Sequence, residues 1–383
     1  MWKLSERMGG LPPYLFIEID RKKKELQEKG FEVINFGVGD PDMPTLPRIV
    51  EALKCSVSDS SVHRYPFGKG RKDFRNAISG YYDRYYNASI DPEEEICVLI
   101  GSKEGIAHFP FAFLNPGEYA LIPEPGYPVY HIGTFLAGGQ SYFMPLQQSN
   151  GFLPDLGAIP SSVREKAKLL YLNYPNNPTS CCAPEEFLLE AIQFCKDHHI
   201  ILLYDAAYAE IFYEGKRPIS FLSLPGAKEV GIEFHSLSKT YNMTGWRVGW
   251  ACGNPSLVKG LATLKENIDS GTFEALQLAG LEALVGPQTD VANLRAIYQR
   301  RRDVLVEGLK KRFPEIIAPE ATFYVWLKVS GDGADFARTL LEKAQIVVTP
   351  GIGFGPSGKE YVRFALTIDE EKITEALSRM DNI

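Results

Sequence analysis

The sequence predicts an α/β protein that combines a large domain built on a mainly parallel sheet with a smaller α+β domain. Strand-like and helix-like segments alternate between residues 46 and 252, which is the pattern of a parallel sheet with helices on its faces. Strand candidates such as residues 200–204 are apolar at consecutive positions, as expected of strands covered on both sides. The length of 383 residues also exceeds what one hydrophobic core usually serves.

The large domain is predicted to cover residues 46–285. Its strands are expected at residues 96–100, 119–122, 141–144, 169–173, 200–204, 231–236 and 248–252. Its helices are expected at about residues 46–55, 71–86, 103–114, 126–137 and 184–198. Seven such strands predict a mixed, mainly parallel sheet, and ligands of such sheets bind beyond the carboxyl ends of the strands.

The small domain is predicted to combine residues 1–45 with residues 286–383. Its first part is expected to contain a helix at 12–30, a short strand at 33–36 and a glycine-containing loop at 37–42. Its second part is expected to contain a helix at 288–312, strands at 322–329, 346–349 and 361–366, and a closing helix from Asp369.

Composition excludes several classes of protein. The formal net charge is −7 and no basic stripe is present, which argues against nucleic acid as a partner. No apolar stretch approaches the length of about 18 residues that spans a membrane, and the N-terminus lacks the apolar core of a secretory signal. The six cysteines show neither metal nor disulfide spacing, and no metal site is predicted. These features predict a cytoplasmic protein with no membrane association.

One lysine, Lys239, lies in an unusual stretch at residues 236–249, Ser-Leu-Ser-Lys-Thr-Tyr-Asn-Met-Thr-Gly-Trp-Arg-Val-Gly. A lysine held between two buried strands loses hydration, which disfavours its charged form and makes the amine nucleophilic. The neighbouring hydroxyls and Arg247 suit a phosphate. An amine beside a phosphate cradle is what a Schiff base with pyridoxal phosphate (PLP) requires. The alternative is a surface lysine in a loop.

Two further strand ends carry groups that suit the ring of PLP. Asp205 follows the strand at 200–204, and Tyr208 comes three residues later. A carboxylate there would keep the pyridine nitrogen protonated, and the phenol would donate to the 3-oxygen of the ring. The alternative for Asp205 is a helix N-cap. Asn177, held in a stiff turn by Pro178, offers a second donor to the 3-oxygen or is only a turn residue.

Other strand ends suit the phosphate, the ring face and the substrate. Gly101 and the helix after it offer backbone N–H groups to a phosphate, the alternative being an unoccupied turn. Tyr127 would stack on a flat cofactor or belong to the core. Arg363 lies inside an apolar strand, where a guanidinium needs an anion, either a substrate carboxylate or an internal salt bridge.

Together these motifs resemble the fold-type I, PLP-dependent aminotransferases of class I and II. The resemblance runs from Leu-Pro-Pro-Tyr at 11–14 to the last helix, and Asn-Asn-Pro-Thr, Asp-Ala-Ala-Tyr, the lysine stretch and Tyr-Val-Arg-Phe-Ala-Leu-Thr follow in the family's order. It implies the transfer of an amino group between an L-amino acid and a 2-oxo acid such as 2-oxoglutarate, with PLP as cofactor.

The resemblance also implies roles for individual residues. The expected catalytic residues are Lys239, Asp205 and Tyr208. The expected PLP-binding residues are Gly101, Ser102, Lys103, Tyr127, Asn177, Asp205, Tyr208, Ser236, Lys239, Arg247 and Tyr65. Tyr65 matches a tyrosine that reaches the phosphate of the neighbouring subunit, which implies a homodimer with shared active sites. The expected substrate-binding residues are Gly39 and Arg363 at the α-carboxylate, and Tyr14.

Within the family, the chain is most similar to the LL-diaminopimelate aminotransferases of lysine biosynthesis. The similarity rests on Leu-Pro-Pro-Tyr-Leu-Phe, Gly-Val-Gly-Asp-Pro-Asp, Gly-Ser-Lys-Glu-Gly-Ile-Ala-His and Val-Thr-Pro-Gly-Ile-Gly-Phe-Gly. Aspartate and alanine aminotransferases share much of this pattern and stay as alternatives. Another PLP reaction, such as β-elimination, and a non-catalytic PLP-binding regulator are further alternatives.

Two segments depart from the family or bear on the substrate. Ser180 stands where the family has glycine after Asn-Pro-Thr, so a positive φ there would be strained and could shift Asn177. Cys181 and Cys182 beside it are also unusual. The segment 266–273, expected to be a loop, offers Glu266 and Asp269 but no arginine, which suits a substrate whose far end carries an amino group.

Overall fold

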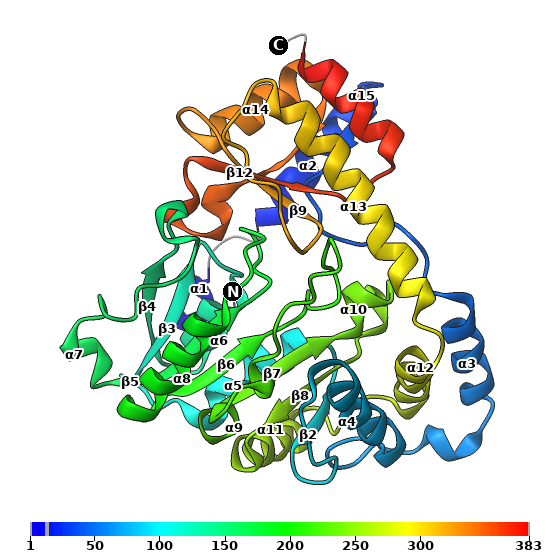
Figure 1. Ribbon diagram of the computed structural model, residues 1–383, viewed down its shortest axis with the longest axis vertical. Coiled ribbons are helices and arrows are strands. Elements are labelled where there is room, and N and C mark those ends of the chain that lie inside the picture. Colours follow the sequence, from blue (N-terminus) through cyan, green and yellow to red (C-terminus); the bar gives the residue numbers. More distant parts are fainter. Residues whose placement is uncertain (1, 12–14, 382–383) are drawn as a thin grey trace.

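The computed structural model describes residues 2–11 and 15–381. A seven-stranded sheet lies in the lower part of the molecule in Figure 1. Its strands are β2 (Ile96–Leu99), β3 (Tyr119–Glu124), β4 (Gln140–Pro145), β5 (Ala167–Asn173), β6 (Ile201–Asp205), β7 (Gly231–Ser236) and β8 (Gly249–Gly253). The order across the sheet is β2-β8-β7-β6-β5-β3-β4. β8 runs antiparallel to β2 and β7, and the other neighbours are parallel. The predicted mixed, mainly parallel sheet is confirmed.

Both faces of this sheet are buried, because successive side chains of each strand point to opposite sides. In β5, Leu169 and Tyr171 belong to one buried cluster, whereas Leu170 and Leu172 belong to another. The first cluster is completed by α5 (Ser102–Phe113), α6 (Val129–Leu136) and α11 (Pro255–Ile268). The second is completed by α3 (Pro47–Val57), α4 (Lys72–Tyr86), α8 (Glu185–His198) and α12 (Glu274–Val285).

Two of these helices, α11 and α12, are absent from the sequence-based prediction. α12 buries residues on several sides of the helix, among them Ala275, Gln277, Ala279 and Ala283, so it lacks a one-sided apolar stripe. α11 does carry local signals. Asn254 caps it by accepting from the N–H of Ser256 at 2.9 Å, and Pro255 is its first residue.

The remaining part of the chain surrounds a smaller sheet. β9 (Tyr324–Lys328), β11 (Thr349–Pro350) and β12 (Tyr361–Ala365) form an antiparallel sheet in the order β11-β12-β9, and β1 (Ile34–Asn35) pairs in parallel with β10 (Ile346–Val347). The helices of this part are α2 (Leu15–Glu28), α13 (Thr289–Lys310), α14 (Gly333–Ala344) and α15 (Glu370–Met380). Ile34 and Phe36 pack in one cluster with residues of β9, β12 and α15. The domain boundaries near residues 45 and 285 stay a prediction.

Two predicted strands of this part differ from the structure. The segment 346–349 is divided, because Ile346 and Val347 pair with β1 while Thr349 and Pro350 pair with β12. The strand expected from residue 322 begins at Tyr324, because Thr322 has a φ of +64°, which lies outside the extended region.

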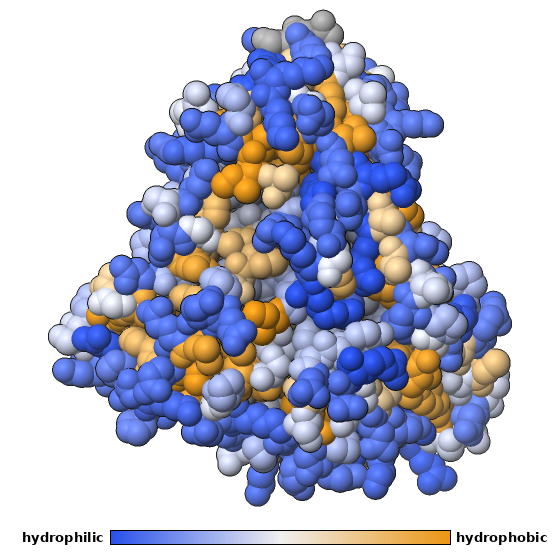
Figure 2. Space-filling model, viewed as in Figure 1, coloured by the Kyte–Doolittle hydropathy of each residue, from blue (hydrophilic) through white to orange (hydrophobic). Residues whose placement is uncertain are grey.

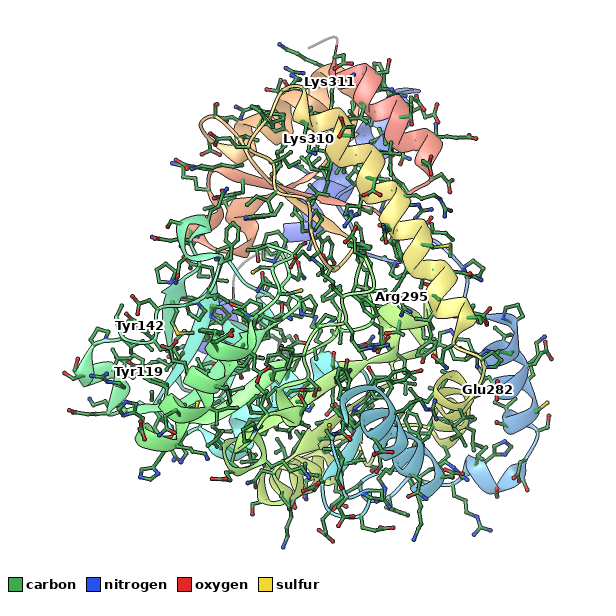
Figure 3. All side chains as sticks on the ribbon, viewed as in Figure 1. Tyr119, Tyr142, Glu282, Arg295, Lys310 and Lys311 are labelled. Carbon is green, nitrogen blue, oxygen red and sulfur yellow. The ribbon has the colours of Figure 1, made fainter. Side chains whose placement is uncertain are left out.

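Side-chain contacts connect neighbouring helices and loops around the larger sheet. Arg295 of α13 donates to Glu210 at 3.3 Å, and Arg48 of α3 donates to Glu282 of α12 at 3.1 Å; Arg295 and Glu282 are labelled in Figure 3. Hydrophilic side chains cover most of the face in Figure 2, and hydrophobic ones gather around the hollow between its upper and lower parts. None of the described helices is long and apolar enough to cross a membrane.

Candidate active site

Polar side chains meet where β5, β6 and β7 end. The register places Asp205, the last residue of β6, between Asn173 of β5 and Phe234 of β7. Asn173 donates from its amide to the Asp205 carbonyl at 2.8 Å. A single helical turn, α10 (Leu237–Thr240), follows β7 at once and carries Lys239. Figure 1 shows α10 on the side of the sheet that faces β9 and β12, so the candidate site lies at the strand ends where it was predicted.

Lys239 has the surroundings of a nucleophilic amine. Its Nζ donates to the Gly39 carbonyl at 3.0 Å. The pKa of Lys239 is lowered to about 8, chiefly by burial; the charges of Arg363 and Arg247 act in the same direction, and the charge of Asp40 opposes them. A substantial fraction of the amine is therefore neutral near pH 8.

Asp205 is buried and held by two donors. The Tyr130 phenol donates to its Oδ2 at 2.8 Å, and the Ala207 N–H donates to its Oδ1 at 3.2 Å. Burial raises the pKa of Asp205 to about 6, and the two hydrogen bonds oppose that rise. No described residue forms an ion pair with Asp205, and a buried carboxylate of this kind favours a positively charged ligand group beside it.

Gly101, Ser102 and Arg247 form a tight cradle between β2 and β8. Gly101 has a φ of +74°, and a Cβ added to it would lie 2.2 Å from Nη2 of Arg247. A Cβ on Gly249 would lie 2.8 Å from the Ser102 nitrogen. The hydroxyl of Ser236 accepts from the Ser238 N–H at 3.1 Å and begins α10. Backbone N–H groups at the start of α5, a guanidinium and a hydroxyl together suit a phosphate.

Arg363 is buried beside neutral partners. Its Nη1 donates to Oδ1 of Asn177 at 2.8 Å and its Nη2 to the Gly37 carbonyl at 3.1 Å. Its Nε is buried and has no hydrogen-bond partner among the described residues. The internal salt bridge considered from the sequence is therefore not the arrangement found around this guanidinium. A buried cation with a spare donor favours an anionic ligand.

Tyr208 and Tyr324 connect the two sides of the site. Their hydroxyls lie 2.9 Å apart, and the Tyr324 ring lies 4.1 Å from Cζ of Arg363. A Cβ on Gly39 would lie 2.0 Å from the Tyr324 hydroxyl, so only glycine permits this approach.

Of the other predicted residues, Tyr127 is partly buried, and Lys103 and Tyr65 are exposed. The partly buried Tyr127 ring packs edge-on to Tyr130 at 5.9 Å. Lys103 lies in the first turn of α5 and is exposed, and Tyr65 is also exposed. Tyr14 lies outside the described residues.

The chain matches the family model "Aminotransferase class I and II" over residues 32–380. This chain is a class I and II aminotransferase. It is 53% identical to an LL-diaminopimelate aminotransferase of Syntrophobacter fumaroxidans, covering 98% of this chain and 97% of the relative. It is 51% identical to an LL-diaminopimelate aminotransferase of Moorella thermoacetica, covering 99% and 98%. Substrate-bound BacF of Bacillus subtilis superposes with a TM-score of 0.95 at 38% identity, covering 100% of this chain and 98% of BacF.

The family assignment confirms three predictions from the sequence. The fold is that of fold-type I aminotransferases, the enzyme class is transaminase, and the cofactor is PLP. The residues present fit that cofactor, because the Gly101–Arg247 cradle suits its phosphate, the buried Asp205 suits its ring nitrogen and Lys239 offers an amine.

Ser180 in this aminotransferase has a φ of +63°, so the condition under which the sequence predicts strain at this serine is met. Asn177 is nevertheless firmly held, because its N–H donates to Oδ1 of Asn173 at 2.8 Å and its Oδ1 accepts from Arg363.

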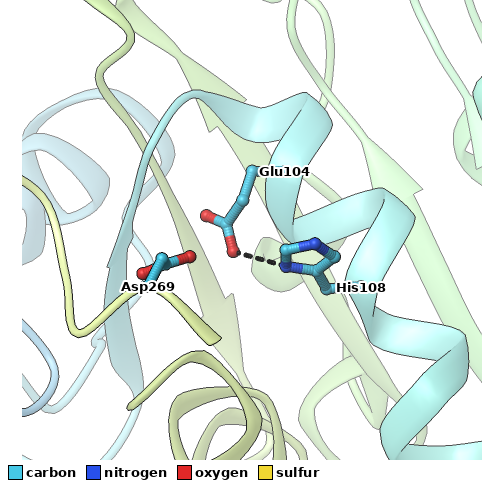
Figure 4. A group of neighbouring side chains, drawn as sticks. All are labelled: Glu104, His108 and Asp269. Carbon is cyan, nitrogen blue, oxygen red and sulfur yellow. Dashed lines mark hydrogen bonds and ion pairs between the residues drawn. The ribbon is translucent and has the colours of Figure 1, made fainter. Parts of the chain in front are cut away.

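The expectation for residues 266–273 needs correction. α11 continues to Ile268, so Glu266 belongs to a helix and not to a loop. Asp269 accepts from Lys265 at 2.8 Å, so its charge already has a partner. Figure 4 shows Asp269 beside Glu104 and His108. Lys265 also donates to Glu104 at 3.2 Å. Because its ammonium group already pairs with both carboxylates, these residues do not favour a metal ion.

Two site residues were missed from the sequence. Tyr130 comes three residues after Tyr127 in the helix expected at residues 126–137, a spacing that could have indicated a shared face. Tyr324 carries no local signal, because it is one of several aromatic residues in an apolar strand. A separate cavity of about 720 Å³ is lined by Cys181, Trp326 and Tyr361 among others. Neither Lys239, Asp205 nor Arg363 lines it, so the chemistry and not the cavity volume locates the site.

Proposed function

We propose that this aminotransferase transfers an amino group from LL-diaminopimelate to a 2-oxo acid such as 2-oxoglutarate, as a step of lysine biosynthesis. The observation that supports this most is the similarity over nearly the whole chain to relatives named LL-diaminopimelate aminotransferase, at 53% and 51% identity. The geometry supports the reaction type independently, because a lysine with a lowered pKa, a buried carboxylate and a buried arginine meet at one edge of the sheet.

Each residue has a proposed task. Bound PLP supplies an electron sink that stabilises negative charge at the substrate Cα. Asp205 holds the proton of the ring nitrogen, and Tyr208 and Asn177 bind the 3-oxygen. Lys239 removes the proton from the substrate Cα as a general base, because burial keeps much of the amine neutral.

Other residues of the site are proposed to bind the substrate and the cofactor. Arg363 binds the α-carboxylate of the substrate with the help of Gly39 and Tyr14. The phosphate and the ring face are assigned to Gly101, Ser102, Lys103, Ser236, Arg247 and Tyr127.

An activity panel tests the substrate. The purified enzyme with 2-oxoglutarate is offered LL-diaminopimelate, aspartate, alanine and aromatic amino acids in turn. We expect the highest kcat/KM with LL-diaminopimelate. A higher kcat/KM with aspartate or alanine would contradict the proposed substrate, and ammonia released without an oxo acid would indicate elimination. Absence of turnover with bound PLP would indicate a regulator.

A lysine variant tests the site. Lys239→Ala should abolish turnover, whereas the control Lys196→Ala should keep it. Lys196 pairs with Glu229 at 2.9 Å and lies in the last turn of α8, which precedes β6. Transamination by the Lys239→Ala variant would refute the assignment.

The active sites are proposed to be shared in a homodimer, in the cytoplasm. Tyr65 and Phe67 expose 75% and 77% of their surface, and exposed aromatic pairs suit a protein interface. If Tyr65 serves the partner's site, mixing Lys239→Ala with Tyr65→Ala subunits under exchange restores one intact site per mixed dimer. Activity should therefore rise on mixing, and a value that stays at the average of the two variants would contradict shared sites.

A further inference from the structure

A closed ring of three hydrogen bonds joins the turn after β5 to the start of β9. Ser180 Oγ donates to the Tyr324 carbonyl at 2.9 Å and lies 2.7 Å from Oγ1 of Thr322. The Tyr324 N–H donates to Oγ1 of Thr322 at 3.0 Å. A serine has one hydroxyl proton, so Thr322 must donate to Ser180. Each of the three hydrogens then has its own acceptor, and the ring runs in one direction only.

The ring is buried and holds two strained residues. Ser180, Thr322 and Tyr324 expose 3%, 0% and 2% of their surface. Ser180 and Thr322 have φ values of +63° and +64°, a region that non-glycine residues, and β-branched ones above all, rarely adopt. Strain of this kind persists where the surroundings over-determine the conformation. The Thr322 N–H adds a bond of 2.8 Å to the Ile211 carbonyl.

The ring lies directly behind the groups proposed to bind the cofactor and the substrate. Tyr324 projects from it, with its hydroxyl 2.9 Å from that of Tyr208 and its ring 4.1 Å from Cζ of Arg363. In the turn after β5, Asn177 precedes Ser180 by three residues and accepts from Arg363 at 2.8 Å. A displacement of the hydrogen-bonded ring would therefore change the positions of Tyr208 and Arg363 together.

We propose that Ser180 and Thr322 are positioning residues for transamination, which hold Tyr324 against Tyr208 and Arg363. This inference rests on the proposed function, because it assigns the substrate carboxylate to Arg363 and the 3-oxygen of PLP to Tyr208. The two hydroxyls act through the Tyr324 backbone. The serine that departs from the family's glycine thus supplies a hydroxyl to the ring in addition to its strained φ.

Hydroxyl deletions in the holoenzyme test the ring. Ser180→Ala and Thr322→Val each remove one hydroxyl and leave the shape of the side chain nearly unchanged. We expect KM for the amino donor and for the oxo acid to rise together by about tenfold, the equivalent of one lost buried hydrogen bond. The pH at which the absorbance of the bound cofactor titrates should also shift, because Tyr208 loses its fixed neighbour.

Three comparisons separate positioning from general stability. Thr322→Ser keeps the hydroxyl and should restore KM. Ser180→Gly relieves the strain but lacks the hydroxyl, so KM should stay raised. The control Ser79→Ala removes a hydroxyl that donates to the Ile90 carbonyl at 2.6 Å in α4, and should lower the melting temperature without changing KM.

Failure of this positioning role can be distinguished from failure of the proposed function. Wild-type KM and cofactor titration in Ser180→Ala, Ser180→Gly and Thr322→Val would overturn the ring's role, even if their melting temperatures fall. If Ser180→Ala and Thr322→Val fail to fold, wild-type KM and cofactor titration in Ser180→Gly alone would overturn it. Wild-type enzyme and Lys239→Ala run in parallel, so a failure of transamination itself would show in the wild type. The pH titration of the bound cofactor would then still show whether the hydrogen-bonded ring positions Tyr208.

Discussion

The phenol of Tyr130 donates a hydrogen bond of 2.8 Å to Oδ2 of Asp205, and both side chains are buried. The bond is one of the few forces that oppose burial and keep the pKa of Asp205 as low as about 6. It therefore bears directly on the role proposed for this carboxylate, which is to keep the ring nitrogen of PLP protonated.

Removing the phenol hydroxyl should weaken cofactor binding. Tyr130→Phe is expected to raise the pKa of Asp205 and to weaken PLP affinity by about tenfold or more, since a hydrogen bond to a charged group contributes about 1.5–3 kcal/mol. Titration of the apoenzyme with PLP measures the affinity. Tyr171→Phe is the matched control, because the Tyr171 ring stacks on Tyr130 at 5.0 Å and gives no hydrogen bond to Asp205. Equal affinities in the two variants would refute the prediction.

The buried carboxylate should make the apoenzyme less stable as the pH rises. The pKa of Asp205 is raised from 3.8 to about 6, so its contribution to stability is fully present below pH 3.8 and is lost as the pH rises through about 6. A shift of about two units corresponds to about 3 kcal/mol. Asp205→Asn has no titrating carboxyl at this position, so it should not show this loss of stability.

The comparison uses urea unfolding of both apoproteins between pH 4.5 and 7.5. As the pH rises, the free energy of unfolding of Asp205→Asn should increase relative to that of the wild type. A difference that is independent of pH would count against a raised pKa.

The amine of Lys239 should become reactive near pH 8. Burial lowers its pKa to about 8, and only the neutral amine attacks a carbonyl. The rate at which the apoenzyme attaches PLP covalently should therefore rise with pH and level off above pH 8. Stopped-flow absorbance measures this rate. A rate that keeps rising toward pH 10.5, the ordinary value for lysine, would show that burial does not act as described.

A methyl group in the phosphate cradle should displace Arg247. In Gly101→Ala the new Cβ would lie 2.2 Å from Nη2 of Arg247, at a φ of +74°. We expect a loss of PLP affinity of at least tenfold, together with a stability loss of about 1 kcal/mol from the strained backbone.

Gly117→Ala separates the two effects, because Gly117 has a φ of +90° and open space around the added Cβ. It should lose stability and keep its PLP affinity. The cradle would be refuted if both variants bound PLP as the wild type does.

Much of the site could be predicted from the sequence because its residues occupy the ends of strands. Asp205 ends β6, Lys239 follows β7, and Gly101 follows β2. The carboxyl ends of parallel strands meet at one edge, so local strand patterns were enough to bring Asp205 and Lys239 together. Strand patterns depend on neighbours two residues apart, and these are visible in the chain itself.

The remaining features depend on contacts between distant residues. α12 was missed because it is buried on several sides and shows no stripe. The segment 346–349 was predicted as one strand, yet its two halves pair with β1 and β12, which are more than 300 residues apart in the chain. Asp269 was predicted to be available to a substrate, but Lys265 of the preceding helix neutralises it.

The sequence by itself determined the fold class, the cofactor chemistry and the lysine proposed to perform it, because these follow from strand periodicity and from motifs within single segments. Only the tertiary structure decided that Tyr130 supports Asp205, that Tyr324 touches Tyr208 and Arg363, and that the Ser180 hydroxyl meets Thr322. Ser180 and Thr322 are 142 positions apart. A hydrogen bond over that separation is set by how the sheets and helices pack, and no local pattern in either segment specifies it.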